Sequence, residues 1–155
     1  MDCVEEASAE RKLVLQASVP KLKVLHLFKT FFPDTYGGIE QVVRTLAEHS
    51  AAIGVDCRVL VLSTSDRGSV DMPEGYRLIR CKQNFALAST GFSLEFLHRL
   101  KVEAQWADLI HVHYPWPFAD LACLLTGTKK PMVMTYHSDV VNQPTLDYLL
   151  SLIHI

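Results

Sequence analysis

The sequence predicts an α/β domain built on a Rossmann-like, doubly wound parallel sheet. Short and almost continuous apolar runs, such as residues 57–62, suit strands that are buried on both faces of a parallel sheet. Apolar residues at helical spacing alternate with these runs along the chain. Gly and Pro mark the connections between them. Strands that alternate with amphipathic helices build right-handed βαβ units, which gives this fold class.

The first strand–helix–strand unit carries the clearest pattern. After a leader at 1–20 that lacks lasting periodicity, the apolar run 21–28 predicts a buried strand. Residues 39–53 place their apolar side chains at helical spacing, and Gly54 marks the end of that helix. The run 57–62 predicts the second strand, which follows after a connection of the length typical of an αβ turn.

The remaining elements continue the alternation. Residues 63–75 predict a long loop, because Ser, Asp, Gly and Pro are frequent there. Helices are expected near 92–106, from the spacing of aromatic and leucine residues, and at 118–125, which follows Pro115 and Pro117. The other expected strands are 76–81, 108–114 and 131–137, and an apolar helix start is expected at 145–155.

Composition and charge exclude several classes of protein. The 155 residues are 49% hydrophobic and 9% aromatic, which is enough for one ordinary domain with a buried core. The formal net charge of -2 at pH 7 provides no basic field, so nucleic acid is not an expected partner. The four cysteines lack the spacing of a zinc site, and no run approaches the length of a membrane span. We therefore expect a reduced, cytoplasmic protein, for which peripheral membrane contact stays open.

The first of three polar clusters follows the first predicted strand, where open α/β sheets bind ligands. Gly37 and Gly38 precede a helix, and such a pair either lets an anion approach the free N–H groups or provides a turn with positive φ. The pair matches neither the dinucleotide fingerprint nor a P-loop. Glu40 is expected to interact with the helix dipole, and Lys29 to offset substrate charge or remain solvated.

The second cluster lies on the strand expected at 108–114. His111 and His113 point to the same face of this strand because one residue separates them. We expect His111 in the core, whereas His113 lies nearer the strand end and is expected to reach a cleft. Two histidines can contribute to a metal site, but no third ligand has suitable local spacing, so no metal is predicted.

The third cluster is His137, Ser138 and Asp139, directly after the last predicted strand. Neighbours in sequence cannot form a Ser-His-Asp triad, because the triad converges from separated positions. The sequence also lacks the Gly-x-Ser-x-Gly elbow of hydrolases. The residues alone therefore indicate a polar loop that either lines a cleft or caps a helix.

Three segments occur in order at predicted strand ends: KVLHLFKTFFPDTYGGIEQVVRTLAEH, DLIHVHYPWPFADL and KPMVMTYHSDVV. Together they resemble the N-terminal domain of family 4 retaining glycosyltransferases, and the similarity is closest to bacterial mannosyl- and rhamnosyltransferases of surface polysaccharide synthesis. The resemblance extends from Lys21 to Leu150. It implies one half of a GT-B architecture, with a sugar nucleotide as co-substrate, no cofactor and no obligatory metal.

The resemblance also implies roles for individual residues. Gly37 and Gly38 would approach the diphosphate or the transferred sugar. His137, the implied catalytic residue, would contact that sugar and place it for transfer with retention. His113 and Asp139 would line the cleft as contacts to the sugar or the acceptor. The implied reaction transfers a hexose such as mannose to a glycan or a lipid-linked acceptor.

The donor-binding C-terminal domain of the family has no counterpart among these residues. We therefore expect residues 21–155 to be a truncated acceptor-side domain that is inactive alone, because positioning both substrates is a large part of catalysis. One alternative is a non-catalytic partner that works with a donor domain on another chain. A nucleotide-binding oxidoreductase is a further alternative, which the missing glycine spacing in the first βα turn disfavours.

Overall fold

The computed structural model describes residues 20–87 and 90–137. A six-stranded sheet in the order β3-β4-β2-β1-β7-β8 forms its centre, and only the pairing of β3 with β4 is antiparallel. This confirms the predicted α/β class with a largely parallel sheet. The elements are β1 (Lys23–Leu27), α2 (Gly38–Ala52), β2 (Asp56–Ser63), β3 (Gly68–Asp71), β4 (Arg77–Lys82), β5 (Phe85–Leu87), β6 (Thr90–Phe92), α3 (Leu94–Trp106), β7 (Leu109–Tyr114), α4 (Pro117–Thr126) and β8 (Met132–Tyr136).

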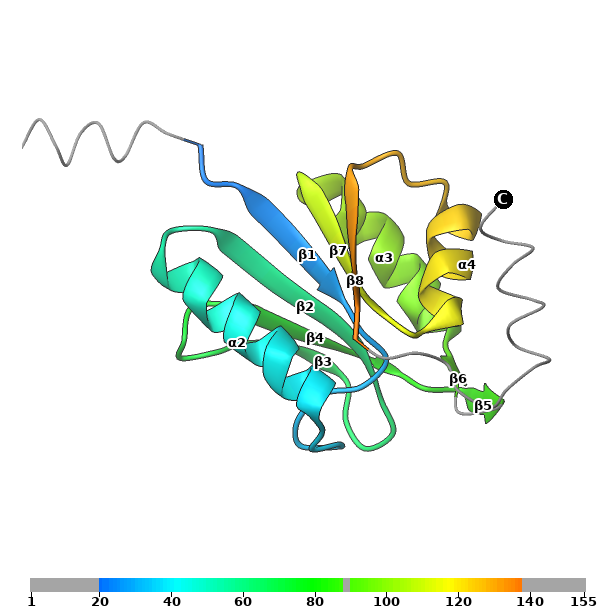
Figure 1. Ribbon diagram of the computed structural model, residues 1–155. Helices are drawn as coiled ribbons and strands as arrows, with labels where there is room; N and C mark the ends of the chain where they lie inside the picture. The colour runs from blue at the N-terminus through cyan, green and yellow to red at the C-terminus, as the bar shows by residue number, and fades with distance from the viewer. Residues whose placement is uncertain (1–19, 88–89, 138–155) are drawn as a thin grey trace, which may run out of the picture.

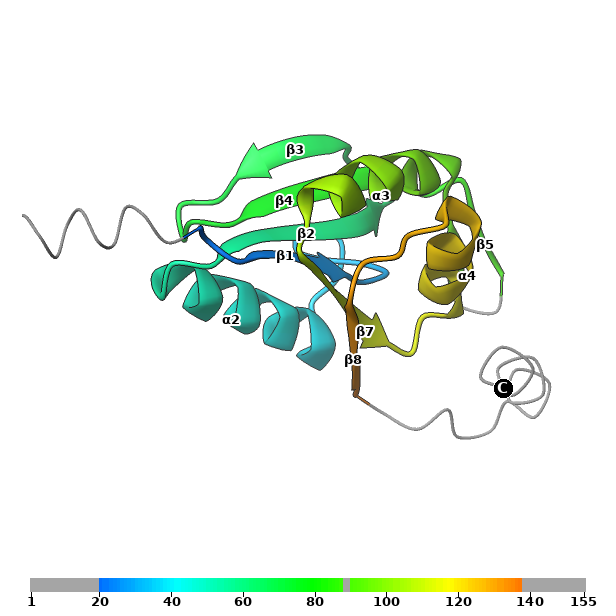
Figure 2. The ribbon, with the colours of Figure 1, turned by 90° about the horizontal axis from the view of Figure 1, so that it is seen from above.

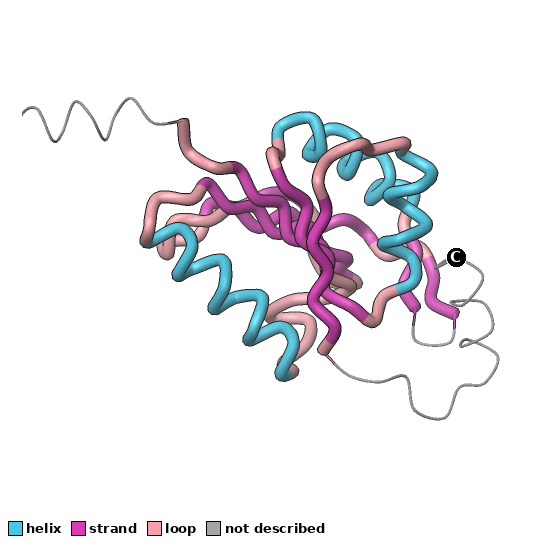
Figure 3. Tube along the Cα trace, turned by 45° about the horizontal axis from the view of Figure 1, so that its top comes forward, coloured by secondary structure: helices cyan, strands magenta, loops and turns pink. Residues whose placement is uncertain are grey.

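Helices cover both faces of the sheet. α2 lies against one face, and α3 and α4 lie against the other (Figures 1 and 2). The tube in Figure 3 shows the strands as the layer between them. The chain passes from β1 to β2 on one side and later returns to β7 on the other side of β1. The strand order therefore reverses between β1 and β7, which is where open α/β sheets bind ligands.

Alternate residues of the strands supply two separate cores. Leu25 and Leu27 pack toward α3 and α4 with Phe96, whereas Val24 and Phe28 pack toward α2. Complete burial of one such aliphatic or aromatic side chain stabilises a protein by about 1.5–3 kcal/mol. The same short strands thus hold the helices on both sides of the sheet.

Local sequence signals fix the helix ends. Ser93 caps α3, because its hydroxyl accepts a hydrogen bond of 3.1 Å from the N–H of Phe96. Pro117 opens α4, and Gly127 closes it with a φ of 64°. Gly54, with a φ of 93°, follows α2 and confirms the predicted end of that helix.

Two parts of the fold differ from the sequence prediction. The segment 63–75, predicted as a loop, contains the edge strand β3, whose four residues are all exposed and therefore lack an apolar pattern. The helix predicted from residue 92 starts only at Leu94, because the preceding residues form the β5–β6 hairpin. The leader up to residue 19 and the helix predicted at 145–155 lie outside the described residues.

Candidate functional site

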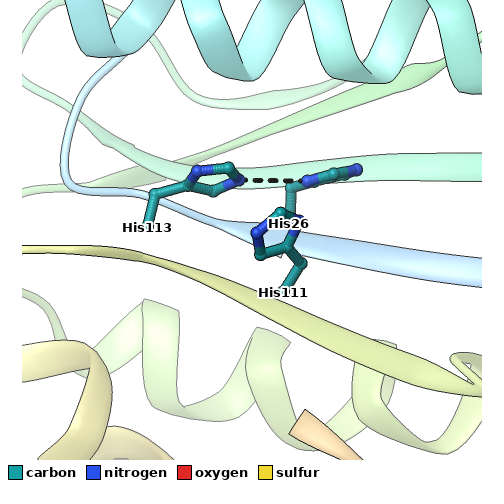
Figure 4. A group of neighbouring side chains, drawn as sticks. All are labelled: His26, His111 and His113. Atoms are coloured by element: carbon teal, nitrogen blue, oxygen red, sulfur yellow. Dashed lines mark hydrogen bonds between the residues drawn. The ribbon is translucent and has the colours of Figure 1, made fainter. Parts of the chain in front are cut away.

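Histidines from three neighbouring strands gather on the side of the sheet that faces α2. His26 on β1 lies opposite His111 on β7 in the strand register, and His113 is two residues further along β7. Figure 4 shows these three rings between the strands and the helix that covers them. His137 directly follows β8, which pairs with β7. Alternation of side chains along each strand puts all four on one face.

Three of these side chains form a continuous hydrogen-bonded series, which we call the histidine row: His26, His113 and His137. The Nδ1 of His26 lies 3.1 Å from the Nε2 of His113. The Nδ1 of His113 lies 3.0 Å from the Nε2 of His137. His111 stands beside the row, and its Nε2 lies 2.7 Å from the hydroxyl of Thr135. The row thus runs from the interior to the end of β8.

The histidine row is buried at His26 and His113 and reaches the surface at His137. The exposed fractions of His26 and His113 are 3% and 0%, whereas His137 is partly exposed. Burial, reinforced by the neighbouring histidines, lowers the pKa of His26 to about 3 and that of His113 to about 2. Burial also lowers the pKa of His137. At neutral pH each ring is therefore uncharged, with one donor and one acceptor nitrogen.

The structure reverses the expected places of the two β7 histidines. His113 was expected to reach a cleft, and this is wrong, because the ring is fully buried between β1 and β8 with the edge of Phe28 against it. His111, expected in the core, is the more exposed of the two. Of the predicted contact residues, His137 is placed at the strand end, and Asp139 lies outside the described residues.

The buried carboxylate of Glu40 holds the glycine loop, the segment 28–37 between β1 and α2, through hydrogen bonds. Its Oε1 accepts hydrogen bonds from the hydroxyls of Thr30 and Thr35, at 2.9 and 2.7 Å, and its exposed fraction is only 7%. Burial by itself would raise the pKa of this carboxyl, but the hydrogen bonds and the charge of Lys29 outweigh it and lower the pKa. Glu40 is thus a buried anion that ties the loop to α2, beyond the helix-dipole role predicted for it.

The two glycines of the loop serve different purposes. Gly37 has an extended φ of -131°, so the predicted alternative of a positive-φ turn is wrong for it. A Cβ there would overlap the carboxylate of Glu40. A Cβ on Gly38 would meet nothing within 4 Å, which leaves open space at the first turn of α2. The start of α2 and the end of β8 lie side by side at one edge of the sheet (Figures 1 and 2).

A separate groove of about 500 Å³ lies beside β8, lined by Val112, Cys123 and Met134 among others. Val112 and Met134 alternate with the histidines of β7 and with their register partners on β8, so their side chains point to the opposite face of the sheet. The groove therefore lies mainly on the α4 side of β8, although Val133, one of its lining residues, has the strand parity of the histidines.

The group that could hold a metal ion among the described residues is His26, His111 and His113, whose ligand nitrogens lie within 4.8 Å of one another. Zinc bound at about 2.1 Å from each nitrogen needs them within about 4.2 Å of one another. The group includes no carboxylate to offset a buried dication, and two of its nitrogens already share a hydrogen bond. We therefore interpret the cluster as hydrogen-bonded imidazoles, and the predicted absence of a metal stays a prediction.

His26 is the member that sequence reasoning missed. It contacts His113 from 87 residues away, so the search for a third histidine at local spacing could not find it. A signal was present, because residue 26 shares strand parity with Val24 and Phe28, which pack on the same face.

Within the two described ranges, none of the helices combines the length and apolar character that crossing a bilayer requires. The family model described as Glycosyltransferase Family 4 matches residues 36–154. D-rhamnosyltransferase WbpZ of Pseudomonas aeruginosa is 44% identical over 125 residues, which are 81% of this chain and 33% of the relative. O-antigen chain mannosyltransferase C of Escherichia coli is 42% identical over 125 residues, which are 81% of this chain and 34% of the relative.

The chain therefore spans about a third of the length of the curated relatives it matches. The matched region includes α2, β7, β8 and all but His26 of the histidine row. The resemblance drawn from the three sequence segments is confirmed. On the match over residues 36–154, the chain belongs to glycosyltransferase family 4.

Proposed function

We propose that this chain supplies the acceptor-side domain of a glycosyltransferase of polysaccharide synthesis. The reaction transfers a hexose of the mannose or rhamnose type from a sugar nucleotide to a glycan or its lipid-linked precursor. The observation that carries the proposal is the place of His137, held by buried neutral histidines at the same sheet edge as the open start of α2. The names of the two relatives support the sugar class.

In this proposal the substrate is contacted from two places, on either side of the point between β1 and β7 where the strand order reverses. His137 contacts the transferred sugar, and the free N–H groups near Gly38 bind the diphosphate. Asp139 provides a second polar contact. His113 is buried and acts on the substrate only through His137.

The proposed transfer retains the configuration at the sugar's anomeric carbon. The bond from this carbon to the diphosphate breaks as the bond to the acceptor oxygen forms on the same face. The acceptor hydroxyl loses its proton to an oxygen of the leaving phosphate. The protein's part is to hold both substrates in place, so we propose that this domain alone turns over little.

We further propose that the reaction takes place on the cytoplasmic side of the membrane. A lipid-linked acceptor would bring the enzyme into peripheral contact with that membrane. An assay with acceptor in vesicles, compared with a water-soluble acceptor glycan, measures this contribution. Equal rates on the two acceptors would argue against membrane contact.

A chimera tests the proposed function. Residues 20–155 of this chain replace the matching third of the E. coli mannosyltransferase, and transfer is measured with a panel of nucleoside diphosphate sugars that includes mannose and rhamnose donors. We expect transfer by the chimera and little by the 155-residue chain alone. A folded chimera that transfers no sugar, or a chain that binds a nicotinamide nucleotide instead, would overturn the proposal.

A further inference from the structure

His26 is the buried end of the histidine row, and the position of its ring proton determines the direction of the row's hydrogen bonds. His26 Nε2 is buried, and it has no hydrogen-bond partner among residues 20–87 and 90–137. His26 Nδ1 and both nitrogens of His113 are engaged within the row. Because each neutral ring carries one proton, the position of the proton on His26 decides the position of every other proton in the row.

Only two arrangements satisfy both hydrogen bonds. In the first, His26 donates from Nδ1 to His113, and His113 donates from Nδ1 to His137, which leaves a bare lone pair on His26 Nε2. In the second, His137 donates to His113 and His113 donates to His26, which leaves an N–H group on His26 Nε2 buried without an acceptor. Orphaned buried N–H groups are rarer in proteins than acceptors with spare capacity, so the first arrangement is favoured.

We propose that His26 and His113 are positioning residues that hold His137 in the tautomer with its proton on Nδ1, so that His137 meets the substrate as a hydrogen-bond donor. Its Nε2 is occupied by the N–H of His113. Its Nδ1 faces away from the row and carries the proton. The tautomer itself is a property of this chain, whereas its use on a substrate rests on the proposed function.

This arrangement excludes a role for His137 as a proton acceptor. A proton added at Nε2 would face the N–H of His113 across 3.0 Å. Reversal of the whole row would relieve that clash only by placing an orphaned N–H on His26. His137 therefore donates to an oxygen that has a lone pair, such as a sugar hydroxyl or a phosphate oxygen of the sugar nucleotide.

The tautomers can be read directly from the 155-residue chain. Long-range ¹H–¹⁵N correlation spectra of the ¹⁵N-labelled protein at neutral pH distinguish protonated from bare ring nitrogens. We expect Nδ1 protonated and Nε2 bare on His26, His113 and His137. Protonated Nε2 on His113 and His137, or a doubly protonated ring anywhere in the row, would overturn the proposal.

Two matched substitutions on β7 test what sets the tautomer. His113→Leu removes the donor to His137, which should then move its proton to Nε2, the form that an unconstrained imidazole favours. His111→Leu makes the same change on the same face but outside the row, and should leave His137 as it is. An unchanged His137 in folded His113→Leu would contradict the proposal. Should that variant fail to fold, the parent spectrum still decides the direction of the row.

Two substitutions of His137 in the chimera, to Asn and to Asp, test whether this residue donates a hydrogen bond to the substrate. The two new side chains have nearly the same shape. The amide nitrogen of Asn stands close to the position of histidine Nδ1, whereas Asp offers only acceptors. We expect His137→Asn to keep transfer within about tenfold of the parent and His137→Asp to lose about a hundredfold. Equal or faster transfer by the Asp variant would overturn the donor role. A parent chimera without transfer would count against the proposed function alone, because the tautomer pattern is measured separately.

Discussion

The two faces of the sheet are built from the same strands with opposite chemistry. Toward α3 and α4, β1 and β7 present Leu25, Leu27 and Ile110, all completely buried. One residue out of step, the same strands present His26 and His113 toward α2, also buried. Buried imidazoles contribute less stability than aliphatic side chains, because desolvation of their nitrogens must be offset by hydrogen bonds. Both faces carry an apolar core, but on the α2 face β1 and β7 give part of that core to buried imidazoles, which lowers stability in exchange for a site.

The largest effect is expected on the apolar face, at Phe96. Its ring is fully buried and lies 5.0 Å from Trp116 and 5.7 Å from Phe118, between centroids. Phe96→Ala should lower the free energy of unfolding by about 3–5 kcal/mol, through lost burial and the cavity left behind. Urea unfolding measures this change. A loss below about 1 kcal/mol would mean that this face is not the main source of stability.

Acid should destabilise the protein through the buried histidines on the α2 face. The folded-state pKa values of His26 and His113, about 3 and about 2, lie below the value of about 6.5 expected in the unfolded chain. The unfolded chain therefore binds protons first, so stability is complete above about pH 6.5 and falls as the pH drops toward 3. At pH 5 each histidine should remove about 2 kcal/mol from the free energy of unfolding.

Urea unfolding over this pH range measures the effect, and His26→Leu should make the dependence shallower. The neighbours that also disfavour a charge on these rings are His111 and His137. A parent protein with the same stability at pH 5 and pH 7.5 would contradict the burial of neutral histidines.

At the exposed end of the row, His137→Ala should reduce transfer by the chimera about a hundredfold, because one hydrogen-bond donor to the substrate is lost. Steady-state kinetics measures this loss. The unfolding free energy should also fall, by about 1–3 kcal/mol, because the buried Nδ1–H of His113 loses its acceptor. A variant that transfers at the parent rate would remove His137 from the site.

The glycine loop should show the smallest effects, with opposite signs. Gly37→Ala pushes the Glu40 carboxylate away from Thr30 and Thr35 and should cost about 1–2 kcal/mol of stability. Gly38→Ala meets open space in a helical position and should stabilise by about 0.5 kcal/mol. Thermal unfolding of both variants measures the contrast. Equal shifts would show that Glu40 does not restrict Gly37.

The sequence predicts the fold better than the site because the two depend on information at different range. Apolar runs and helical spacing are local, so five of the sheet's strands and the helices α2, α3 and α4 could be predicted. The polar edge strand β3 has no such pattern. The histidine row depends on the register of β1, β7 and β8, which no local pattern specifies.

The burial of His113 shows the same limit. Its position near the end of β7 suggested exposure, but β8 extends beside it, with Thr135 as its register partner. The side chain of His137, on the α2 face, then covers the ring of His113. Both histidines of β7 lie between β1 and β8, so the cover that Phe28 and His137 provide, rather than distance from a strand end, buries His113.

The most direct test of the contrast between the two faces is the free energy of unfolding of His26→Leu beside that of Leu25→Ala, at pH 7.5. These neighbours on β1 point to opposite faces. Leu25→Ala should lose about 2–5 kcal/mol, whereas His26→Leu should change stability by about 1 kcal/mol or less, because it removes the unpartnered Nε2 of His26 but leaves Nε2 of His113 without its donor. A loss in His26→Leu as large as that in Leu25→Ala would contradict the account, since the histidine would then be a stabilising part of the core.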